Sequence, residues 1–476
     1  MAVREIGDFQ LCRFPAGITA DSRRVKPGMV YVAIAGPRTD GHAFLQAAHQ
    51  AGAAAFLVED PAAASLLPED AEIYCAASTR TLYPLLLRDA AGMPDKDLTL
   101  AGVTGTNGKT TTAYLVHELL NRCQRRGTLL STVEFRTPAS VQPAGNTTPG
   151  PELFYRLLQQ TVQEGGDFVS MELSSHALDQ HRTDGVQFTS AVFTNFTGDH
   201  LDYHKTMEHY FASKRRLFTE MLSGTAVINT DDPAGKKLAT ELQGRCITFG
   251  TEPGADCRIV PGELTASGST FTLLRGGSSF ALRTRLNGLY NLFNLTGALL
   301  SAECCGVPWQ KLTELTEECH PAPGRLEAIP VNGITFFADY AHTDDALIQA
   351  LKGLRNFAPR RIITVFGCGG DRDRTKRPRM GKAAAEHSDL VIITSDNPRS
   401  EDPMEIIAEI RQGIPAGTEY RVEADRAAAI RLAYQLAKPG DVVLLAGKGH
   451  EDYQEINGVR YPFDDREEIR NLLKIN

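Results

Sequence analysis

One stretch constrains the fold of this chain more than any other, namely LTLAGVTGTNGKTTT at positions 98–112. An apolar run with β-branched residues leads into a glycine-containing turn, and a helix-period pattern follows at 113–120, which predicts a strand, a loop and a helix. Gly105 and Gly108 let backbone N–H groups surround a polyphosphate, and the helix presents its positive end to the same anion. The stretch therefore predicts a nucleotide site.

Two side chains of this loop fit the chemistry of phosphate binding. Lys109 can reach the terminal phosphates, and the Thr110 hydroxyl suits a ligand of Mg²⁺. The loop departs from the strict spacing G-x-x-x-x-G-K-[ST], because Val103 stands where the first glycine is expected. The alternative is a plain glycine-rich turn before an ordinary helix, and Gly-Lys-Thr-Thr in this context argues against it.

The chain is too long for a single hydrophobic core, since 476 residues predict roughly two to four domains. A net charge of −8 and a pI near 5.9 argue against a nucleic-acid partner. The nine cysteines are scattered and include no C-x-x-C motif, which favours a reducing compartment. We find no signal-like N-terminus and no apolar run of membrane length, so we expect a cytoplasmic protein with no membrane partner.

Residues 1–92 predict a first α/β unit. Positions 30–35 and 54–58 are apolar and β-branched and predict buried strands. The polar loops at 19–23 and 36–41 flank the first of these strands and carry hydroxyl and guanidinium groups that suit a phosphorylated ligand. Taken alone, such loops are surface turns more often than ligand sites. A linker is expected at about 91–96.

The second unit, residues 97–320, begins with the phosphate loop. A predicted strand delivers Glu172 at its carboxyl end, and the next one delivers Asp199 and His200. Ligands bind beyond the carboxyl ends of parallel strands, so these side chains should face the phosphate loop. A lone Glu or His is usually structural, but a carboxylate and an imidazole at two successive strand ends favour a Mg²⁺ site.

The third unit, residues 321–476, contains three near-continuous apolar strands at 362–366, 389–394 and 442–446. Each strand ends in a polar loop with glycine or proline, which predicts a buried parallel sheet with one functional edge. Arg372 stands at the last glycine of a G-x-G-x-x-G pattern and argues against a nicotinamide site. The Asp-Asn-Pro-Arg loop could be a plain turn, but its place at a strand end favours a ligand site.

Together these motifs resemble those of the Mur ligases, the cytoplasmic enzymes that build the peptide stem of bacterial peptidoglycan. The similarity covers the whole chain, and the departure of the phosphate loop from the strict spacing is the family's own. One difference is Gly198, where family members often carry a larger polar residue. The shorter matches are Asp199-His200, Asn291 and Asn294 in YNLFN, Arg325 in PGRLE and Asp339 in ADYAHT.

The resemblance implies an α/β fold of three domains, each built on its own sheet. A small N-terminal domain (1–92) would bind UDP, a central phosphate-loop ATPase domain (97–320) would bind ATP, and a Rossmann-like C-terminal domain (321–476) would bind an amino acid. The Asp-Asn-Pro-Arg loop at 396–399 is the signature of the family members that join meso-diaminopimelate to UDP-N-acetylmuramoyl-L-alanyl-D-glutamate. The resemblance thus implies this UDP-dipeptide, ATP and meso-diaminopimelate as partners, and we expect a monomer.

The resemblance also implies three sets of binding residues. The ATP set comprises Gly105, Thr106, Asn107, Gly108, Lys109, Thr110, Thr111, Asn291, Asn294, Arg325 and Asp339. The UDP-muramoyl-dipeptide set comprises Ser22, Pro37, Arg38, Thr39, Asn146, Thr147, Thr148, Ser174, Gln180 and Arg182. The diaminopimelate set comprises Arg372, Asp396, Asn397, Pro398, Arg399, Gly447 and Glu451.

The implied catalytic residues are Lys109, Glu172, His200 and Lys214, with Thr110, Glu172, His200 and Lys214 around Mg²⁺. Lys214 matches the family lysine that reacts with CO₂ to give a carbamate, although the sequence alone predicts an ordinary surface lysine on a helix. In the implied mechanism the D-glutamate carboxylate attacks the γ-phosphate of ATP, and the amine then attacks the acyl phosphate. Mg²⁺ and Lys109 would offset the charge of the two anions that meet in the first step.

Three other functions share part of this pattern. A folate polyglutamylating ligase has the same ATP loop, but it has no reason to carry about 97 residues ahead of that loop. A lysine-adding relative of the diaminopimelate ligase is a closer alternative. A phosphate-loop switch or motor is the alternative from another class of protein.

Overall fold

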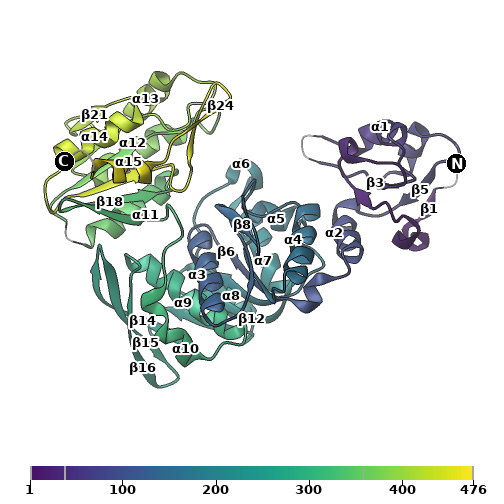
Figure 1. The fold of residues 1–476 in the computed structure, drawn as a ribbon, viewed down its shortest axis with the longest axis horizontal. Coiled ribbons are helices and arrows are strands. Elements are labelled where there is room, and N and C mark those ends of the chain that lie inside the picture. The colour runs from purple at the N-terminus through teal and green to yellow at the C-terminus, as the bar shows by residue number, and fades with distance from the viewer. Residues whose placement is uncertain (1–2, 37–38, 358, 474–476) are drawn as a thin grey trace.

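Three sheets follow one another along the chain, and helices pack on each (Figure 1). The computed structural model describes residues 3–36, 39–357 and 359–473, so Pro37 and Arg38 of the predicted UDP loop lie outside the described residues. The predicted fold class, three α/β domains in series, is confirmed. Within the described ranges, no helix is both long enough and apolar enough to cross a membrane.

The N-terminal sheet is entirely parallel, in the order β1-β5-β4-β3-β2. Its elements are β1 (Arg4–Glu5), β2 (Ile18–Thr19), β3 (Val30–Val32), α1 (Leu45–Gln50), β4 (Ala55–Val58), β5 (Glu72–Cys75) and α2 (Thr79–Ala90). Both strands predicted for this unit are present. The first is shorter than predicted, because the chain turns after it through a bridge between Ala35 and Asp40.

The middle sheet has eleven strands in the order β16-β15-β14-β13-β12-β11-β6-β10-β7-β8-β9. Its strands are β6 (Thr99–Thr104), β7 (Gly127–Leu130), β8 (Glu134–Arg136), β9 (Val141–Pro143), β10 (Phe168–Glu172), β11 (Phe188–Phe193), β12 (Leu222–Asn229), β13 (Cys246–Gly250), β14 (Cys257–Thr265), β15 (Gly268–Arg275) and β16 (Ser278–Thr284). Its helices are α3 (Lys109–Arg122), α4 (Pro151–Gln163), α5 (Ser175–Asp179), α6 (Leu201–His204), α7 (Met207–Thr219), α8 (Pro233–Glu241), α9 (Leu289–Cys304) and α10 (Trp309–Glu314). The strands from β7 to β14 through the centre are parallel, and antiparallel strands extend both edges.

Both faces of the central parallel strands are buried. Along β6, Leu100 belongs to the hydrophobic cluster on one face, and Ala101 and Val103 belong to the cluster on the other. The same alternation holds in β11, where Ala191 and Val192 point to opposite clusters. Because a sheet covered on both faces leaves its strand ends as the place for polar ligand groups, the fold directs function to that edge.

The C-terminal sheet has the order β17-β18-β22-β19-β20-β21, with only β17 antiparallel to its neighbour among these described strands. Its elements are β17 (Glu327–Val331), β18 (Ile334–Asp339), α11 (Asp344–Arg355), β19 (Ile362–Phe366), α12 (Lys376–His387), β20 (Leu390–Ile393), α13 (Pro403–Arg411), β21 (Tyr420–Val422), α14 (Arg426–Leu436), β22 (Val442–Ala446) and α15 (Asp465–Leu472). A separate hairpin comprises β23 (Tyr453–Ile456) and β24 (Val459–Pro462). The three strands predicted for this unit are confirmed.

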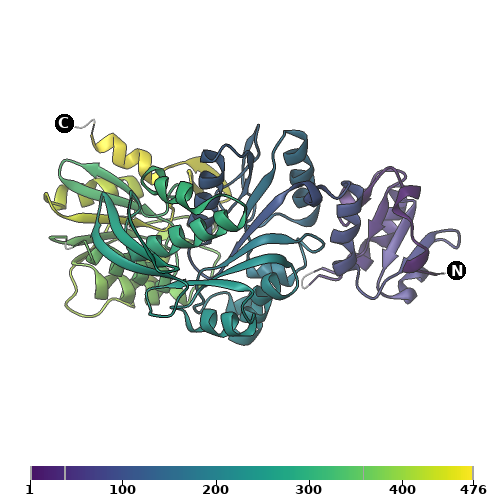
Figure 2. The same ribbon diagram turned by 90° about the horizontal axis from the view of Figure 1, so that it is seen from below.

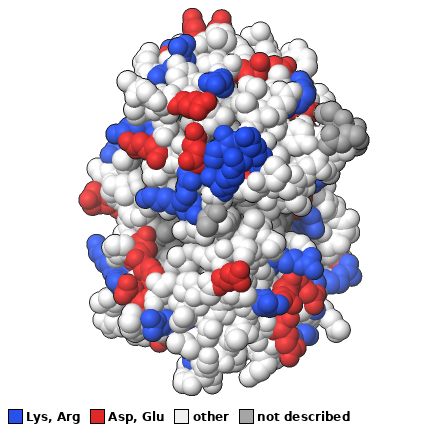
Figure 3. All heavy atoms as spheres, turned by 90° about the vertical axis from the view of Figure 1, so that its left-hand side faces the viewer, with Lys and Arg blue, Asp and Glu red and all other residues white. Residues whose placement is uncertain are grey.

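The three units lie side by side, with the middle one between the other two (Figures 1 and 2). Basic and acidic side chains are interspersed on the face formed by the C-terminal and middle units, and the largest basic cluster occupies only the middle of that face (Figure 3). This face therefore carries no continuous basic surface of the kind that nucleic-acid binding requires. The limits 1–92, 97–320 and 321–476 stay predictions.

Candidate active site

The phosphate loop lies between β6 and α3, as predicted from the sequence. Gly105 and Gly108 have φ values of 146° and 84°, which L side chains rarely adopt. Space also excludes a side chain, because a Cβ at Gly105 would lie 1.9 Å from Thr194 Oγ1 and one at Gly108 would lie 2.4 Å from Asn294 Oδ1. Both glycines are therefore required for the loop to fold against its neighbours.

Two lysines converge on one carbonyl oxygen of this loop. The Nζ atoms of Lys109 and Lys214 donate to Gly105 O at 3.0 and 2.7 Å, and Lys109 Nζ also donates to Thr106 O at 2.9 Å. Neither lysine forms an ion pair with a carboxylate among the described residues. Burial lowers the pKa of Lys109, and burial together with the nearby Lys109 cation lowers the pKa of Lys214 well below its usual value.

The burial of Lys214 corrects the interpretation from sequence alone. Its side chain is 1% exposed, and its Nζ lies 4.5 Å from the ring centroid of Tyr210. It is therefore not a surface lysine. A buried amine without a carboxylate partner favours its neutral form, and a neutral amine is what reaction with CO₂ requires.

Glu172 and His200 flank the same loop. Glu172 is 1% exposed, and its carboxylate accepts hydrogen bonds from the backbone N–H and hydroxyl of Thr132 at 2.7 and 3.2 Å. His200 has a φ of 54°, and its Nε2 lies 3.4 Å from Asp199 Oδ2. Desolvation and the Lys109 and Lys214 cations lower the pKa of His200, so a neutral imidazole is available to a metal. The Glu172 carboxylate and the Thr110 hydroxyl are oxygen donors of the kind that Mg²⁺ prefers, and the His200 imidazole lies beside them.

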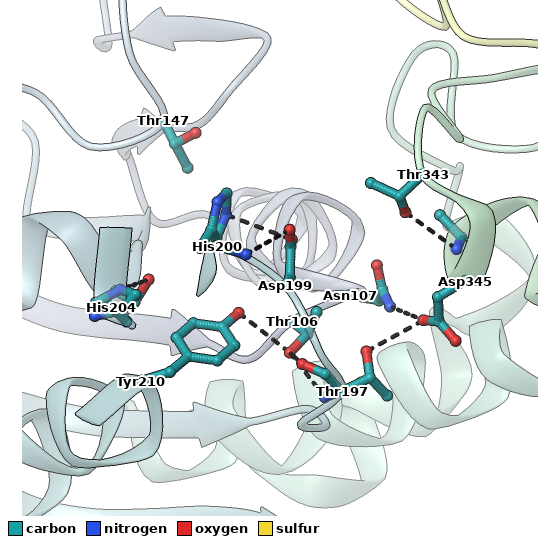
Figure 4. A network of polar contacts seen from close by, with 12 residues as sticks. Thr106, Asn107, Thr147, Thr197, Asp199, His200, His204, Tyr210, Thr343 and Asp345 are labelled. Atoms are coloured by element: carbon teal, nitrogen blue, oxygen red, sulfur yellow. Dashed lines mark hydrogen bonds and ion pairs between the residues drawn. The ribbon is translucent and has the colours of Figure 1, made fainter. Parts of the chain in front are cut away.

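A cavity of about 530 Å³ lies between the phosphate loop and the C-terminal domain. The cavity is lined by Glu172, His200 and every predicted ATP residue except Gly105. On its far side, Asp345 at the start of α11 accepts hydrogen bonds from Asn107 Nδ2 at 3.3 Å and Thr197 Oγ1 at 3.1 Å (Figure 4). Arg325 Nη2 donates to Thr110 Oγ1 at 3.1 Å. The third domain therefore closes the nucleotide cavity.

A second cavity, of about 400 Å³, lies between the N-terminal and middle domains and is lined by Gln180 and Arg182. Arg182 Nη1 donates to Thr148 O at 3.1 Å, and the Thr148 hydroxyl accepts from the backbone N–H of Ser174 at 3.0 Å. Arg182 Nη2 also donates to Gln180 Oε1 at 2.8 Å, so four predicted dipeptide residues form one hydrogen-bonded group. Among the others, Ser22 lies in a short 3₁₀ helix of the first domain, Asn146 and Thr39 are exposed, and Thr147 lines the nucleotide cavity instead.

The loops that follow β20 and β22 meet in the third domain and bring part of the predicted diaminopimelate set together. Lys448 is fully buried, and its Nζ lies 3.3 Å from Asp396 Oδ1, 3.1 Å from Asn397 Oδ1 and 3.5 Å from Glu451 Oε2. Asn397 Nδ2 donates to Glu451 Oε2 at 2.8 Å. Burial and the Asp396 carboxylate raise the pKa of Glu451. A Cβ at Gly447 would lie 3.2 Å from Asp396 Oδ2, so Gly447 borders the same group.

The two arginines of the set are placed differently. Arg399 Nη1 donates to Gly370 O at 2.7 Å, and its Nε lies 3.7 Å from Glu455 Oε2, so its side chain is held by its own loops. Arg372 is exposed, and Pro398 between the loops is buried. The positions of Arg372 and Arg399 do not test whether these residues bind a ligand, so the ligand role of each stays a prediction.

Four residues at these sites were not identified from the sequence. They are Thr132, which holds Glu172, Asp345, which contacts the phosphate loop, Glu152 and Lys448. Glu152 at the start of α4 accepts hydrogen bonds from Thr19, Arg24 and Tyr83 of the first domain. Of these four residues, only Lys448 could have been identified from the sequence. It lies in the glycine-containing loop GKGHE, which follows a predicted strand.

Three family models match successive parts of the chain. Residues 16–98 match the model described as Mur ligase family, catalytic domain, residues 103–302 match the Mur ligase middle domain, and residues 324–449 match the Mur ligase, glutamate ligase domain. The three matches follow the three sheets in order.

Relatives of known name match nearly the full length. The UDP-N-acetylmuramoyl-L-alanyl-D-glutamate--2,6-diaminopimelate ligase of Aquifex aeolicus is 41% identical over 457 residues, covering 96% of this chain and 93% of the relative. The enzyme of the same name from Synechococcus elongatus is 44% identical over 472 residues, covering 96% and 93%. A solved structure of that name has a TM-score of 0.72 at 36% identity and covers 100% and 99%. Mycobacterium tuberculosis folylpolyglutamate synthase, 19% identical with a TM-score of 0.64 over 78% and 92%, shares the fold.

Proposed function

We propose the following function for this chain, which belongs to the Mur ligase family. It is an ATP-dependent ligase that adds diaminopimelate to UDP-N-acetylmuramoyl-L-alanyl-D-glutamate in peptidoglycan precursor synthesis. The observation that carries this conclusion is full-length similarity to ligases of that name, together with a phosphate loop that lines a cavity closed by the third domain.

The arrangement of this chain's residues supports an acyl-phosphate mechanism. Lys109 lies in the phosphate loop and would release Gly105 O and Thr106 O to contact the γ-phosphate of ATP. The D-glutamate carboxylate would then attack the γ-phosphorus and release ADP, and the amine of diaminopimelate would attack the acyl carbon and release phosphate. Because the two reacting anions repel each other, the lysine cation is most valuable in the first transition state.

Thr110, Glu172 and His200 would hold Mg²⁺, which would supply charge neutralisation at the phosphates. We propose that Lys214 adds a further oxygen ligand after its neutral Nζ bonds to the carbon of CO₂ and loses a proton to solvent. Its burial and its lowered pKa support this proposal. The carbamate would also place an anion beside the Lys109 cation, where the neutral amine supplies none.

The remaining expectations concern substrates and assembly. Gln180, Arg182, Thr148 and Ser174 would hold the dipeptide, and the cavity that they share with the first domain would receive the sugar nucleotide. The loops at 396–399 and 447–451 would hold diaminopimelate. The monomeric state and the cytoplasmic location stay predictions.

A product assay tests the function directly. The protein is incubated with ATP, Mg²⁺, UDP-N-acetylmuramoyl-L-alanyl-D-glutamate and a panel of diamino acids, and the products are identified by mass spectrometry. We expect a tripeptide product with meso-diaminopimelate and little ATP hydrolysis when either acceptor or amine is left out. A lysine product would indicate the lysine-adding relative, and a folate product would indicate a polyglutamylating ligase. ATP hydrolysis without either substrate would indicate a switch or motor.

A further inference from the structure

A second group of potential metal ligands lies outside the cavity that contains the phosphate loop. Asp179 at the end of α5, His204 at the end of α6 and His209 on α7 each offer one ligand atom, and these atoms lie within 4.8 Å of one another. Asp179 is half-buried, His204 is buried and His209 is exposed. The exposed imidazole gives an ion a route from solvent to the buried one.

Two of these residues face each other directly, with His209 Nε2 2.9 Å from Asp179 Oδ1. Their remaining polar atoms are hydrogen-bonded in the pattern that orients metal ligands, and His209 Nδ1 lies 3.1 Å from His204 O. Asp179 Oδ2 accepts from the Tyr203 hydroxyl at 2.8 Å. Metal-bound imidazoles usually donate their second N–H to a carbonyl or a similar acceptor, and metal-bound carboxylates are hydrogen-bonded as well.

The ring of His204 has the same arrangement. Its Nε2 lies 2.9 Å from Ser175 Oγ, and its Nδ1 faces Ser213 Oγ at 3.5 Å. Ser213 Oγ lies 3.3 Å from Asp179 Oδ1, so His204 Nδ1 and the carboxylate point toward the same hydroxyl. Bond lengths of about 2.0–2.2 Å to Zn²⁺ place tetrahedral ligand atoms roughly 3.3 Å apart. Small side-chain movements would bring the three ligand atoms to that spacing.

We propose that Asp179, His204 and His209 form a binding site for a late first-row divalent ion, with Zn²⁺ as the best fit. Two imidazoles and one carboxylate are the donors that such ions prefer, whereas Mg²⁺ prefers oxygen ligands and retains its water. Three protein ligands leave one position of a tetrahedral ion for water or another ligand. This site does not rest on the proposed ligase function, because its ligands are separate from Thr110, Glu172, His200 and Lys214.

The site connects three helices that each contain a predicted active-site residue or lie directly next to one in the sequence. The helix α5 is followed by Gln180, α6 begins after His200, and α7 carries Lys214. The ring of His176 lies between the two groups, with centroids 4.8 Å from His200 and 5.4 Å from His204. An ion at Asp179, His204 and His209 would fix these elements relative to one another and stabilise the protein.

The test measures Zn²⁺ binding to full-length protein after treatment with a chelator, by equilibrium dialysis and elemental analysis in excess Mg²⁺ and ADP. The variant His209→Ala removes a ligand whose side chain is 51% exposed, so the fold should tolerate it. His320→Ala is the matched control, because His320 is 55% exposed and lies 3.2 Å from Glu118. It belongs to no three-ligand group within the described residues.

We expect wild type and His320→Ala to bind one more Zn²⁺ per chain than His209→Ala. Loss of an outer-shell partner alone costs about 10–100-fold in metal affinity, so loss of a ligand should weaken Zn²⁺ binding at least about 100-fold. The variant Asp179→Asn should lose the same ion. Co²⁺ at the site should give the absorption bands of a four-coordinate ion in wild type and lose them in His209→Ala.

Two results would overturn the proposal. One is equal Zn²⁺ binding by wild type and His209→Ala, which would leave Asp179 and His209 as a simple ion pair between helices. The other is a wild-type protein that does not prefer Zn²⁺ over Mg²⁺ outside the phosphate-loop cavity. The readout is metal content, so either result would leave the proposed ligase activity unaffected.

Discussion

The phosphate-loop cavity and the loops at 396–399 and 447–451 each contain buried lysine, but the surroundings of the lysine charge differ. Lys109 and Lys214 contact carbonyl oxygens and have no carboxylate ion pair among the described residues. Lys448 in the third domain has Asp396, Asn397 and Glu451 around its Nζ. The two lysines of the first region therefore have no ion-pair partner until a polyanion binds, whereas Lys448 in the second region is already paired.

This difference indicates how each region recognises its ligand. The Lys109 cation and a bound Mg²⁺ would attract any polyphosphate, so the nucleotide site would gain affinity from charge and specificity from the shape of its cavity. The loops at 396–399 and 447–451 contain acidic and basic groups that are already paired, so a zwitterionic ligand such as diaminopimelate would have to replace these internal pairs with its own. Changes at the second region should then alter the choice of amino acid more than the use of ATP.

The largest expected effect tests this claim at Arg399. Its guanidinium contacts Gly370 O and lies near Glu455, and we predict that it turns to the distal carboxylate when diaminopimelate binds. Arg399→Ala should lower kcat/KM for diaminopimelate by about two to four decades, corresponding to the roughly 2–5 kcal/mol of a buried charge pair. The KM for ATP should stay near its wild-type value, as steady-state kinetics would show.

Arg421→Ala is the control for this variant, because Arg421 lies on β21 of the same domain and its side chain is 51% exposed. It should behave as wild type. If Arg399→Ala kept full diaminopimelate activity, Arg399 would only brace its loop. If wild type used lysine as well as diaminopimelate, the predicted basis of specificity would be wrong, since a site built for a polar group rejects ligands without it by about 10⁴–10⁵.

The next effect is expected at Lys109 in the nucleotide region. Lys109→Ala removes a cation that nothing else in the phosphate loop replaces, and kcat should fall by on the order of 10²–10³. Lys382→Ala, on a surface helix with 63% exposure, should change nothing. Unchanged circular dichroism with reduced turnover would locate the effect in catalysis. Near-normal turnover of Lys109→Ala would contradict the assignment of the phosphate loop.

A smaller effect should follow from removal of CO₂. If the buried Lys214 amine carries a carbamate, activity should fall after CO₂ stripping and return with bicarbonate, by about 10–100-fold, the range for lost support of a metal site. A ¹³C NMR signal from labelled bicarbonate should be present in wild type and absent in Lys214→Ala. Activity that is indifferent to bicarbonate, with no such signal, would count against the carbamate.

The two regions also differ in what the sequence could predict. Gly105, Gly108 and Lys109 were identified because a strand, a turn and a helix are local patterns, and Asp396 and Glu451 because parallel strands end at one edge. The burial of Lys214 was missed because it depends on the loop after β6, which is distant in the sequence and contacts α7 in the fold. The same holds for Asp345 and Glu152, whose partners belong to other domains.

The smallest expected effect concerns stability and pH in the second region. Burial and Asp396 raise the pKa of Glu451, so the folded state binds its proton more strongly than the unfolded state does. Its contribution to stability is therefore fully present below the usual pKa of 4.5 and is lost as the pH rises through the folded-state pKa. In Glu451→Gln this group does not titrate, while the amide oxygen can still accept from Asn397.

We therefore expect the Tm of wild type to fall more steeply than that of Glu451→Gln as the pH rises above about 4.5. The difference should be about 2–4 °C, which corresponds to ~1 kcal/mol for a domain of this size. Calorimetry of both proteins across this window measures it, with Glu419→Gln as the control because Glu419 is 63% exposed. Parallel pH profiles for wild type and Glu451→Gln would mean that Lys448 already compensates the carboxylate completely, and that the second region is neutral without any protonation.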